Sequence, residues 1–370
     1  MASKSSIAAF IRKRGKYALP LVWFLVFLLL GEVAIRVYHA VLAPPRTIEL
    51  DERLGWRAAA NVTSDHTAED AEGKAYSVRY RTEDHGFRFF GDTASSAPKL
   101  LVLGSSFTHA VEVSNEDTYY ARIKDDLGVE LFACGVGGHG SLQQFLMLDQ
   151  YVDRIAPDLV LWQLCPNDLI NNSFDLEWRS RINNNSTRRP YLSPDGAISY
   201  ALPRPFASVR RFARAHLHFV SFLFFRIDRR GASKRDSVEF EIAAVGAKHE
   251  GLRRSARITQ EIFRRAKERC TGVPVVAFCV PEQQPFSDEM RRIAIDQGFL
   301  YCDSVIGALA EADASGTCLF AADGTHWNAA GHRVVGGQLA EFIRKHQLLE
   351  TRRPKPPSRQ TPGQSKGSPP

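Results

Sequence analysis

Four short motifs along the chain carry the residue types that acyl transfer requires. In chain order they are Gly104-Ser105-Ser106, a glycine-rich run over 134–140, Pro166-Asn167-Asp168, and the segment from Asp323 to Asn328. Together they offer a hydroxyl nucleophile, backbone and amide hydrogen-bond donors, and a carboxylate close to an imidazole. Ester chemistry of this kind needs a nucleophile, a base that takes its proton, and donors that stabilise the oxyanion. Each motif alone is common by chance, so the prediction of one active site depends on the ordered set.

In this order the motifs resemble the four blocks of the SGNH (GDSL-like) hydrolases, which are named after the serine, glycine, asparagine and histidine of those blocks. The resemblance extends from about Leu100 to the helix after His332. It implies an α/β three-layer sandwich, flavodoxin-like, with a central mostly parallel sheet. Three positions depart from the family pattern: Ser105 stands where aspartate is usual, Cys134 where asparagine often stands, and Cys165 where glycine is usual.

Ser106 matches the family's nucleophile, and its place in the sequence suits that role. It follows the apolar run 99–103, which is typical of a strand buried on both faces of a parallel sheet. Ligands of such sheets bind beyond the carboxyl ends of the strands. Ser105 is expected to keep the turn by a short capping hydrogen bond.

His326 is the expected general base and Asp323 the carboxylate that orients it. The two residues are three positions apart, and an imidazole titrates close to neutral pH, which suits a base. His332 is expected to pack or cap rather than react. A metal site is disfavoured, because these residues and the distant His139 offer too few ligands at a recognised spacing.

The resemblance assigns the oxyanion hole to three donors: the backbone N–H groups of Ser106 and Gly138 and the side-chain amide of Asn167. Four glycines lie within 135–140, which is costly unless the backbone needs unusual dihedrals or close approach to a ligand. The spacing of these glycines does not fit a dinucleotide-binding loop. No cofactor is expected.

The ends of the chain account for its basic character. The chain has 370 residues and a formal net charge of +7. Segments 1–16 and 351–370 each carry five basic residues and no acidic one, so the remainder is slightly acidic and no nucleic-acid partner is indicated. The six cysteines are expected to be buried thiols for the most part, although their pairing cannot be read from the sequence.

An uncharged stretch from Tyr17 to Leu30, followed by further apolar residues, predicts a transmembrane anchor over 17–42. Glu32 and Arg36 must then lie near its outer end or pair across one helical turn. The basic segment 1–16 is expected to stay in the cytoplasm by the positive-inside rule, which places the rest outside the inner membrane, in the periplasm. A cleaved signal peptide is the alternative, but Pro44 after Ala43 disfavours processing.

The remaining chain divides into four parts. Segment 43–98 is a lead-in with short strands, expected near Gly55–Arg57, 76–81 and 86–88, and 99–348 is the SGNH hydrolase-like domain. Residues 174–248 are an insertion whose basic amphipathic helix, expected over 206–228, packs on the domain, covers the site as a lid, or lies on a membrane surface. The tail 349–370 is expected to be disordered.

The leading hypothesis is an extracytoplasmic serine esterase or O-acyltransferase that forms an acyl-enzyme on Ser106. The expected substrate is a small acyl ester of an envelope or exported carbohydrate. The segment from Asp323 to Trp327 also partly resembles the alginate-type polysaccharide O-acetyltransferases. The alternative from another class is a catalytically silent domain of this fold that binds polysaccharide together with polysaccharide-assembly partners.

Overall fold

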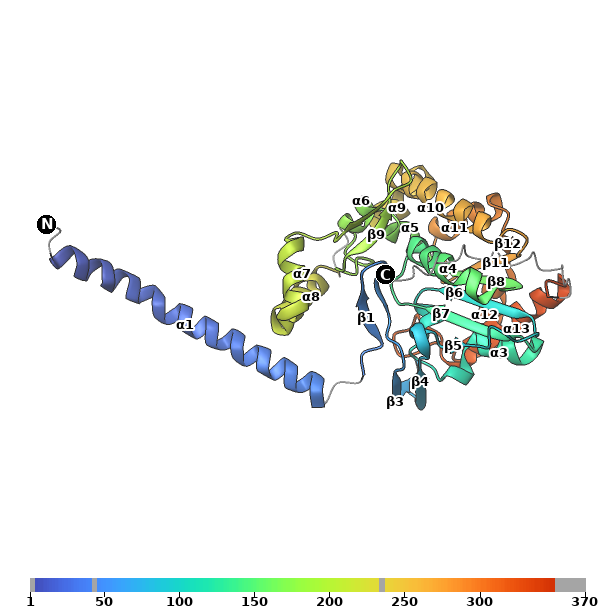
Figure 1. The fold of residues 1–370 in the computed structure, drawn as a ribbon, viewed down its shortest axis with the longest axis horizontal. Helices are drawn as coiled ribbons and strands as arrows, with labels where there is room; N and C mark the ends of the chain where they lie inside the picture. The colour runs from blue at the N-terminus through green and yellow to red at the C-terminus, as the bar shows by residue number, and fades with distance from the viewer. Residues whose placement is uncertain (1–3, 42–44, 233–236, 350–370) are drawn as a thin grey trace, which may run out of the picture.

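The apolar runs of the sequence form one six-stranded sheet in the computed structural model, which describes residues 4–41, 45–232 and 237–349 (Figure 1). The strand order is β12-β11-β8-β6-β7-β5, with all neighbours parallel except the edge strand β5. The strands are β5 (Phe89–Phe90), β6 (Lys99–Gly104), β7 (Glu130–Gly135), β8 (Leu159–Leu164), β11 (Val275–Cys279) and β12 (Leu300–Tyr301).

Helices cover both faces of this sheet. Leu101 and Leu103 of β6 pack in the core beneath α4 (Ser141–Ile155), α10 (Glu250–Arg269) and α11 (Phe286–Asp296). The intervening Leu100 and Val102 belong to the opposite core, beneath α3 (Tyr119–Leu127), α12 (Ser304–Ala314) and α13 (Ala329–Lys345). Successive strand residues point to opposite faces, so the two separate cores show a three-layer α/β sandwich. This is the predicted fold class.

The first three motifs meet at one edge of the sheet because they follow three adjacent parallel strands. Gly104 at the end of β6 pairs with Gly135 at the end of β7, and Leu103 pairs with Trp162 of β8. The chain therefore leaves these strands at neighbouring points on the same edge. α2 (Ser106–His109) follows β6 directly, and α5 (Asp168–Asn171) begins four residues after β8.

The lead-in packs beside the main sheet and contributes its edge strand. It forms two antiparallel hairpins, β1 (Ile48–Asp51) with β2 (Gly55–Ala58) and β3 (Thr63–Glu69) with β4 (Ala75–Arg81). The strand expected over 86–88 is displaced. A short 3-10 turn, η1 (Asp84–Gly86), occupies its beginning, and the paired residues are those of β5. A second such turn, η2 (Asn115–Asp117), precedes α3.

The insertion between the third and fourth motifs forms a hairpin and several helices at one end of the domain (Figure 1). The helix expected over 206–228 is two helices, because the backbone leaves helical geometry at Leu217 (φ −127°, ψ 83°). The elements are α6 (Phe174–Arg179), β9 (Arg189–Leu192), β10 (Ile198–Ala201), α7 (Ala207–His216), α8 (His218–Ala232), α9 (Val238–Val245) and η3 (Gly246–Lys248).

A long helix, α1 (Lys4–Val41), precedes the domain (Figure 1). Its stretch Leu19–Val41 has a mean hydropathy of 2.1 and no buried residue, so this helix is long and apolar enough to be a signal anchor or a membrane span. Glu32 and Arg36 pair across one helical turn at 2.8 Å, one of the two arrangements expected. Of the tail 349–370 that was expected to be disordered, residues 350–370 lie outside the described residues.

Candidate active site

Ser106 stands at the first position of α2, immediately beyond the carboxyl end of β6. The turn that places it is tight: a Cβ at Gly104 would lie 2.1 Å from Oγ1 of Thr108, so only glycine fits there. Ser106 is partly exposed, whereas its neighbours Ser105 and Phe107 are buried. Because the first N–H groups of a helix have no intrahelical acceptor, the N–H of Ser106 is available to a ligand.

His326 meets Ser106 across 220 positions of sequence. Its Nε2 lies 2.8 Å from Oγ of Ser106, and its Nδ1 lies 2.5 Å from Oδ2 of Asp323. The ring of Phe107 packs against the His326 ring with centroids 5.0 Å apart. The hydroxyl, imidazole and carboxylate thus form one hydrogen-bonded chain in the order that general-base activation of a serine requires.

Asp323 is held ionised by the turn that it begins. Its Oδ1 accepts hydrogen bonds from the backbone N–H groups of Thr325 and His326, both at 2.9 Å. Burial opposes ionisation, but the hydrogen bond from the His326 ring and these two N–H groups outweigh it and lower the pKa of this carboxyl below its usual value. The carboxylate is therefore charged at neutral pH and can stabilise an imidazolium.

The other histidines near the site are buried and neutral. Burial lowers the pKa of His109, His139 and His332 to about 3 in each case. Nδ1 of His332 accepts a hydrogen bond from the N–H of Tyr119 at 3.2 Å, which is a packing role of the kind expected for this residue. Of these four histidines, His326 is the one in contact with Ser106.

The two other expected oxyanion donors lie at the ends of the neighbouring strands. Gly138 adopts φ +78° three residues after β7, and the position of a Cβ on Gly137 would be 3.9 Å from Cβ of Ser106. Asn167 precedes α5, and its side chain makes no capping hydrogen bond. Within the described residues, the N–H of Gly138 donates to no backbone acceptor. Neither donor is thus engaged by these partners, and both lie beyond the carboxyl ends of the strands next to β6.

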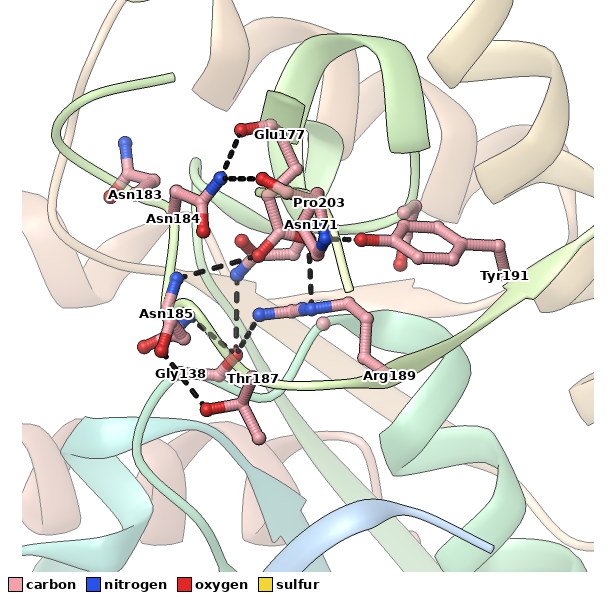
Figure 2. A network of polar contacts seen from close by, with 12 residues as sticks. Gly138, Asn171, Glu177, Asn183, Asn184, Asn185, Thr187, Arg189, Tyr191 and Pro203 are labelled. Atoms are coloured by element: carbon pink, nitrogen blue, oxygen red, sulfur yellow. Dashed lines mark hydrogen bonds and ion pairs between the residues drawn. The ribbon is translucent and has the colours of Figure 1, made fainter. Parts of the chain in front are cut away.

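Polar residues from α5 and from the insertion hold the carbonyl of Gly138 (Figure 2). This oxygen accepts from the guanidinium of Arg189 at 3.1 Å and from the side-chain amides of Asn171 and Asn185, each at 3.4 Å. A Cβ on Gly138 would lie 2.5 Å from Oδ1 of Asn185. These contacts fix the loop. The positive φ of Gly138 and the closeness of Asn185 both favour glycine at this position.

The Arg189 guanidinium is itself fixed by a buried ion pair. Its Nε lies 2.8 Å from Oε2 of Glu177, and the two side chains are 1% and 0% exposed. The hydroxyl of Tyr191 donates to the same carboxylate at 2.7 Å. Figure 2 shows these side chains converging above the Gly138 loop from α6 and β9. No motif in the sequence marks the residues of this network.

The lead-in holds the glycine loop from another direction. The indole N–H of Trp56 donates to the carbonyl of Gly137 at 3.0 Å, and the carbonyl of Trp56 lies 2.8 Å from Nε2 of the neutral His139. The lead-in and the insertion together leave the loop little freedom. A backbone N–H group that is held in place in this way does not have to reorganise when negative charge develops on the substrate oxygen.

Ser105 does not make the capping hydrogen bond that the sequence predicted. Its side chain forms no cap, and its backbone N–H donates to Oε1 of Gln163 at 3.0 Å. The same oxygen accepts from Oγ1 of Thr108 at 3.2 Å. Gln163 at the end of β8 thus fixes the turn through the backbone, so the serine in place of the usual aspartate leaves the turn intact.

A second carboxylate, Glu112, lies beside the imidazole. Its Oε1 is 3.8 Å from Nδ1 of His326, and its side chain is 22% exposed. Burial raises the pKa of this carboxyl, Asp323 adds to the rise, and His326 opposes it. Glu112 was not singled out from the sequence, because nothing local marks a glutamate in the turn after α2.

In the part of the chain that the structure describes, two groups of side chains have donor atoms close enough together to hold a metal ion. One consists of Glu112, Asp323 and His326, and the other of Asp70, Glu72 and Cys318. In the first group both ring nitrogens of His326 already face a protein partner, Ser106 and Asp323. The hydrogen bonds from Ser106 through His326 to Asp323 therefore explain why the donor atoms of this group lie close together. All six cysteines are free thiols, and five of them are buried.

Asp168 of the third motif is fully buried and links two motifs. Its Oδ2 accepts from the hydroxyl of Ser141 at 3.0 Å and from the amide of Gln144 at 3.3 Å, both in α4. Burial raises the pKa of Asp168 to about 7, against these hydrogen bonds. Asp168 thereby connects the Asn167 turn to the helix that follows the glycine loop.

The sequence family agrees with this geometry. The model of the GDSL-like lipase/acylhydrolase family matches residues 102–334, more than half of the chain and all four motifs. The chain belongs to this family, whose members include ester-hydrolysing enzymes. No curated protein matches the chain.

Several solved structures of esterases are similar to the chain at low identity. The lipase/acylhydrolase from Enterococcus faecalis is 13% identical, with 67% of this chain and 96% of that chain covered and a TM-score of 0.38. The psychrotrophic esterase EstA from Pseudoalteromonas sp. is 11% identical, with 67% and 98% covered and a TM-score of 0.38. A mutant of an acetyl-xylooligosaccharide esterase from Geobacillus Stearmophilus is 15% identical, with 69% and 96% covered and a TM-score of 0.34.

Proposed function

We propose that this chain is a membrane-anchored serine esterase or O-acyltransferase that acts on small acyl esters of carbohydrates. The observation that carries the proposal is the chain of hydrogen bonds from Ser106 through His326 to Asp323, at 2.8 and 2.5 Å. A serine that only capped a helix would not need an imidazole on its hydroxyl and an ionised carboxylate behind that ring.

In the proposed first step, Oγ of Ser106 attacks the ester carbonyl while Nε2 of His326 takes the hydroxyl proton. The carbonyl oxygen becomes an oxyanion that accepts hydrogen bonds from the N–H groups of Ser106 and Gly138 and from the amide of Asn167. Asp323 stabilises the imidazolium. His326 then returns the proton to the leaving alkoxide, and the acyl group stays on Ser106.

In the second step an acceptor hydroxyl attacks the acyl-enzyme, again with His326 as base. Water as acceptor makes the chain an esterase, and a carbohydrate hydroxyl makes it an O-acyltransferase. Carbohydrate esters are the proposed substrates, and one enzyme of similar structure is an acetyl-xylooligosaccharide esterase. Release assays with acetylated xylan and with p-nitrophenyl acetate, with and without added sugar acceptors, distinguish the two outcomes.

The proposed location is the outer side of the inner membrane, in the periplasm, with the N-terminus in the cytoplasm. The apolar stretch Leu19–Val41 and the five basic residues within 1–16 support this orientation. Fusions of alkaline phosphatase and of green fluorescent protein to the C-terminus test it. Phosphatase activity without fluorescence is expected, and fluorescence without phosphatase activity contradicts the orientation.

Hydrolysis of p-nitrophenyl acetate by the full chain in detergent tests the enzymatic function. Activity is expected in the wild type and loss to background in Ser106→Ala and in His326→Ala. His332→Ala is the matched histidine control for the folded state, since it changes packing and not the proposed base. A folded wild type without activity on any acyl ester would favour the alternative, a silent polysaccharide-binding domain.

A further inference from the structure

The helical hairpin α7–α8 of the insertion has its apolar side chains on the outside. Phe206 immediately precedes α7, and Val209 and Phe212 follow three residues apart, on one side of the helix. They are 74%, 55% and 58% exposed. A helix on the surface of a water-soluble domain turns such a face inward.

One arginine of the same helix, Arg210, faces the protein. Arg210 forms two hydrogen bonds to the carboxylate of Asp228 in α8, at 2.8 and 3.2 Å. The two side chains are only 11% and 14% exposed. The hydroxyl of Ser186 also donates to Asp228, at 2.7 Å. The hairpin therefore pairs charges in its interior and presents apolar groups outward, which is the reverse of the arrangement that water favours.

The hairpin is attached to the apolar helix α1. Glu32 of α1 accepts hydrogen bonds from the first two N–H groups of α8, those of His218 and Phe219, at 3.0 and 2.8 Å. Arg36 donates to the carbonyl of His216 at 3.0 Å, at the end of α7. These contacts satisfy both charged side chains of the apolar stretch and cap the break between the two helices.

An aromatic contact continues this interface toward the middle of the apolar stretch. The rings of Phe27 and Phe219 meet edge to face with centroids 5.4 Å apart. The stretch Leu19–Val41 has 23 residues, about 34 Å of helix at 1.5 Å per residue, close to the ~30 Å of a hydrocarbon core. If α1 spans a bilayer, Phe27 and Glu32 lie within or at the edge of that core, and α8 begins at the same depth.

We propose that the α7–α8 hairpin is a second membrane-binding element, which lies in the lipid interface beside α1 with Phe206, Val209 and Phe212 among the acyl chains. The occupant of this face is the bilayer itself. Continuity with α1 at Glu32 and Phe27 favours lipid over a second protein, because the exposed face adjoins a helix built to contact lipid. The proposal concerns attachment to the membrane, and it holds whether or not Ser106 is catalytic.

Depth-dependent quenching in the full chain tests the proposal. A cysteine at Phe212 (Phe212→Cys), labelled with an environment-sensitive fluorophore, reports on the apolar face of α7. The labelling background is Cys318→Ser, since Cys318 is the one native thiol that is not buried. The protein is reconstituted into phosphatidylcholine bilayers with and without lipids that carry a nitroxide on the acyl chain.

Two further probes calibrate the measurement. The cysteine of Phe24→Cys is in the apolar stretch of α1. The cysteine of Glu311→Cys is at an exposed position of α12, a helix on the side of the domain away from the hairpin (Figure 1). A blue-shifted emission and quenching by nitroxide lipid are expected at Phe24 and Phe212, and neither at Glu311. Val209→Cys gives a second reading on the same face and should match Phe212.

Three results would overturn the proposal. Quenching at Phe24 without quenching at Phe212 and Val209 would show that α1 inserts while the hairpin stays in water. A blue shift at Phe212 without quenching would show that protein, either a second copy or this domain, covers the face. Absence of quenching at Phe24 would remove the span that the hairpin is proposed to accompany.

Discussion

Arg189 in the insertion donates a hydrogen bond of 3.1 Å to the carbonyl of Gly138, 51 positions earlier in the chain. Gly138 is the residue whose N–H is proposed to hold the oxyanion, so this contact joins the inserted segment to the reacting atoms. The buried partner Glu177 fixes the guanidinium from the other side. The insertion therefore sets the position of a proposed catalytic donor, the N–H of Gly138.

Replacing Arg189 by methionine is expected to lower both stability and kcat. The loss leaves Glu177 buried without its partner, at a cost of about 3–5 kcal/mol. A misplaced donor costs up to roughly 10²-fold in rate. Thermal unfolding and kcat of the folded fraction measure the two effects, and Arg188→Met is the neighbouring control. The double variant Glu177→Leu/Arg189→Met should recover stability and not kcat; recovery of both would contradict the positioning role.

Replacing Ser105 by alanine is expected to change little. The hydroxyl lies 3.5 Å from Oε1 of Gln163, whereas the backbone N–H, which alanine keeps, lies at 3.0 Å. We expect a loss of at most about 1 kcal/mol in the free energy of unfolding and near-normal kcat. Gln163→Leu removes the acceptor of the turn, so it should lower both the free energy of unfolding and kcat by more than Ser105→Ala does. A large loss of activity in Ser105→Ala would show that the hydroxyl replaces the family's aspartate in function.

Replacing Glu112 by glutamine is expected to shift the pH profile of activity. Burial raises the pKa of this carboxyl above its usual value, and the carboxyl lies 3.8 Å from the ring that takes the Ser106 proton. Replacing it by an amide, which does not titrate, should therefore change the acid limb of the kcat/KM profile and leave the plateau nearly unchanged. A profile of kcat/KM between pH 4 and 9 measures this. A collapse of the plateau with no shift would assign Glu112 a direct part in the reaction.

Asp168 is expected to make stability depend on pH. Burial raises its pKa from 3.8 to about 7, so between these values the folded protein keeps a proton that the unfolded chain has lost. The free energy of unfolding then falls as pH rises through this window, by about 4 kcal/mol for a shift of roughly three units. Asp168→Asn should remove this fall. Thermal midpoints at pH 5 and pH 8 measure the difference, and an unchanged pH dependence in the variant would contradict it.

Local sequence patterns predicted the sheet and the four motifs well. Residues 100–103 and 159–162 are continuously apolar because both faces of their strands are covered, and such runs are visible without any tertiary information. Asp323 and His326 were found because their contact spans only three positions.

The remaining features depend on contacts between distant residues. Gln163 stabilises the Ser105 turn from another strand, and Arg189 becomes a site residue only when the insertion folds over the Gly138 loop. The break at Leu217 is capped by Glu32, which accepts from the N–H of His218, 186 positions away. The periodicity of 206–228 therefore predicted one continuous helix. Nothing local distinguishes these residues from ordinary surface amides, arginines and glutamates.

Covalent modification of Ser106 is the most direct test of the central claim that this hydroxyl is the nucleophile. The full chain is treated with a fluorophosphonate, and the adduct is mapped by peptide mass spectrometry, with thermal midpoints recorded for every variant. We predict a single adduct on the peptide that contains Ser106, absent from Ser106→Ala and strongly reduced in the folded His326→Ala variant. An adduct on another residue, or undiminished labelling without the His326 ring, would contradict the account.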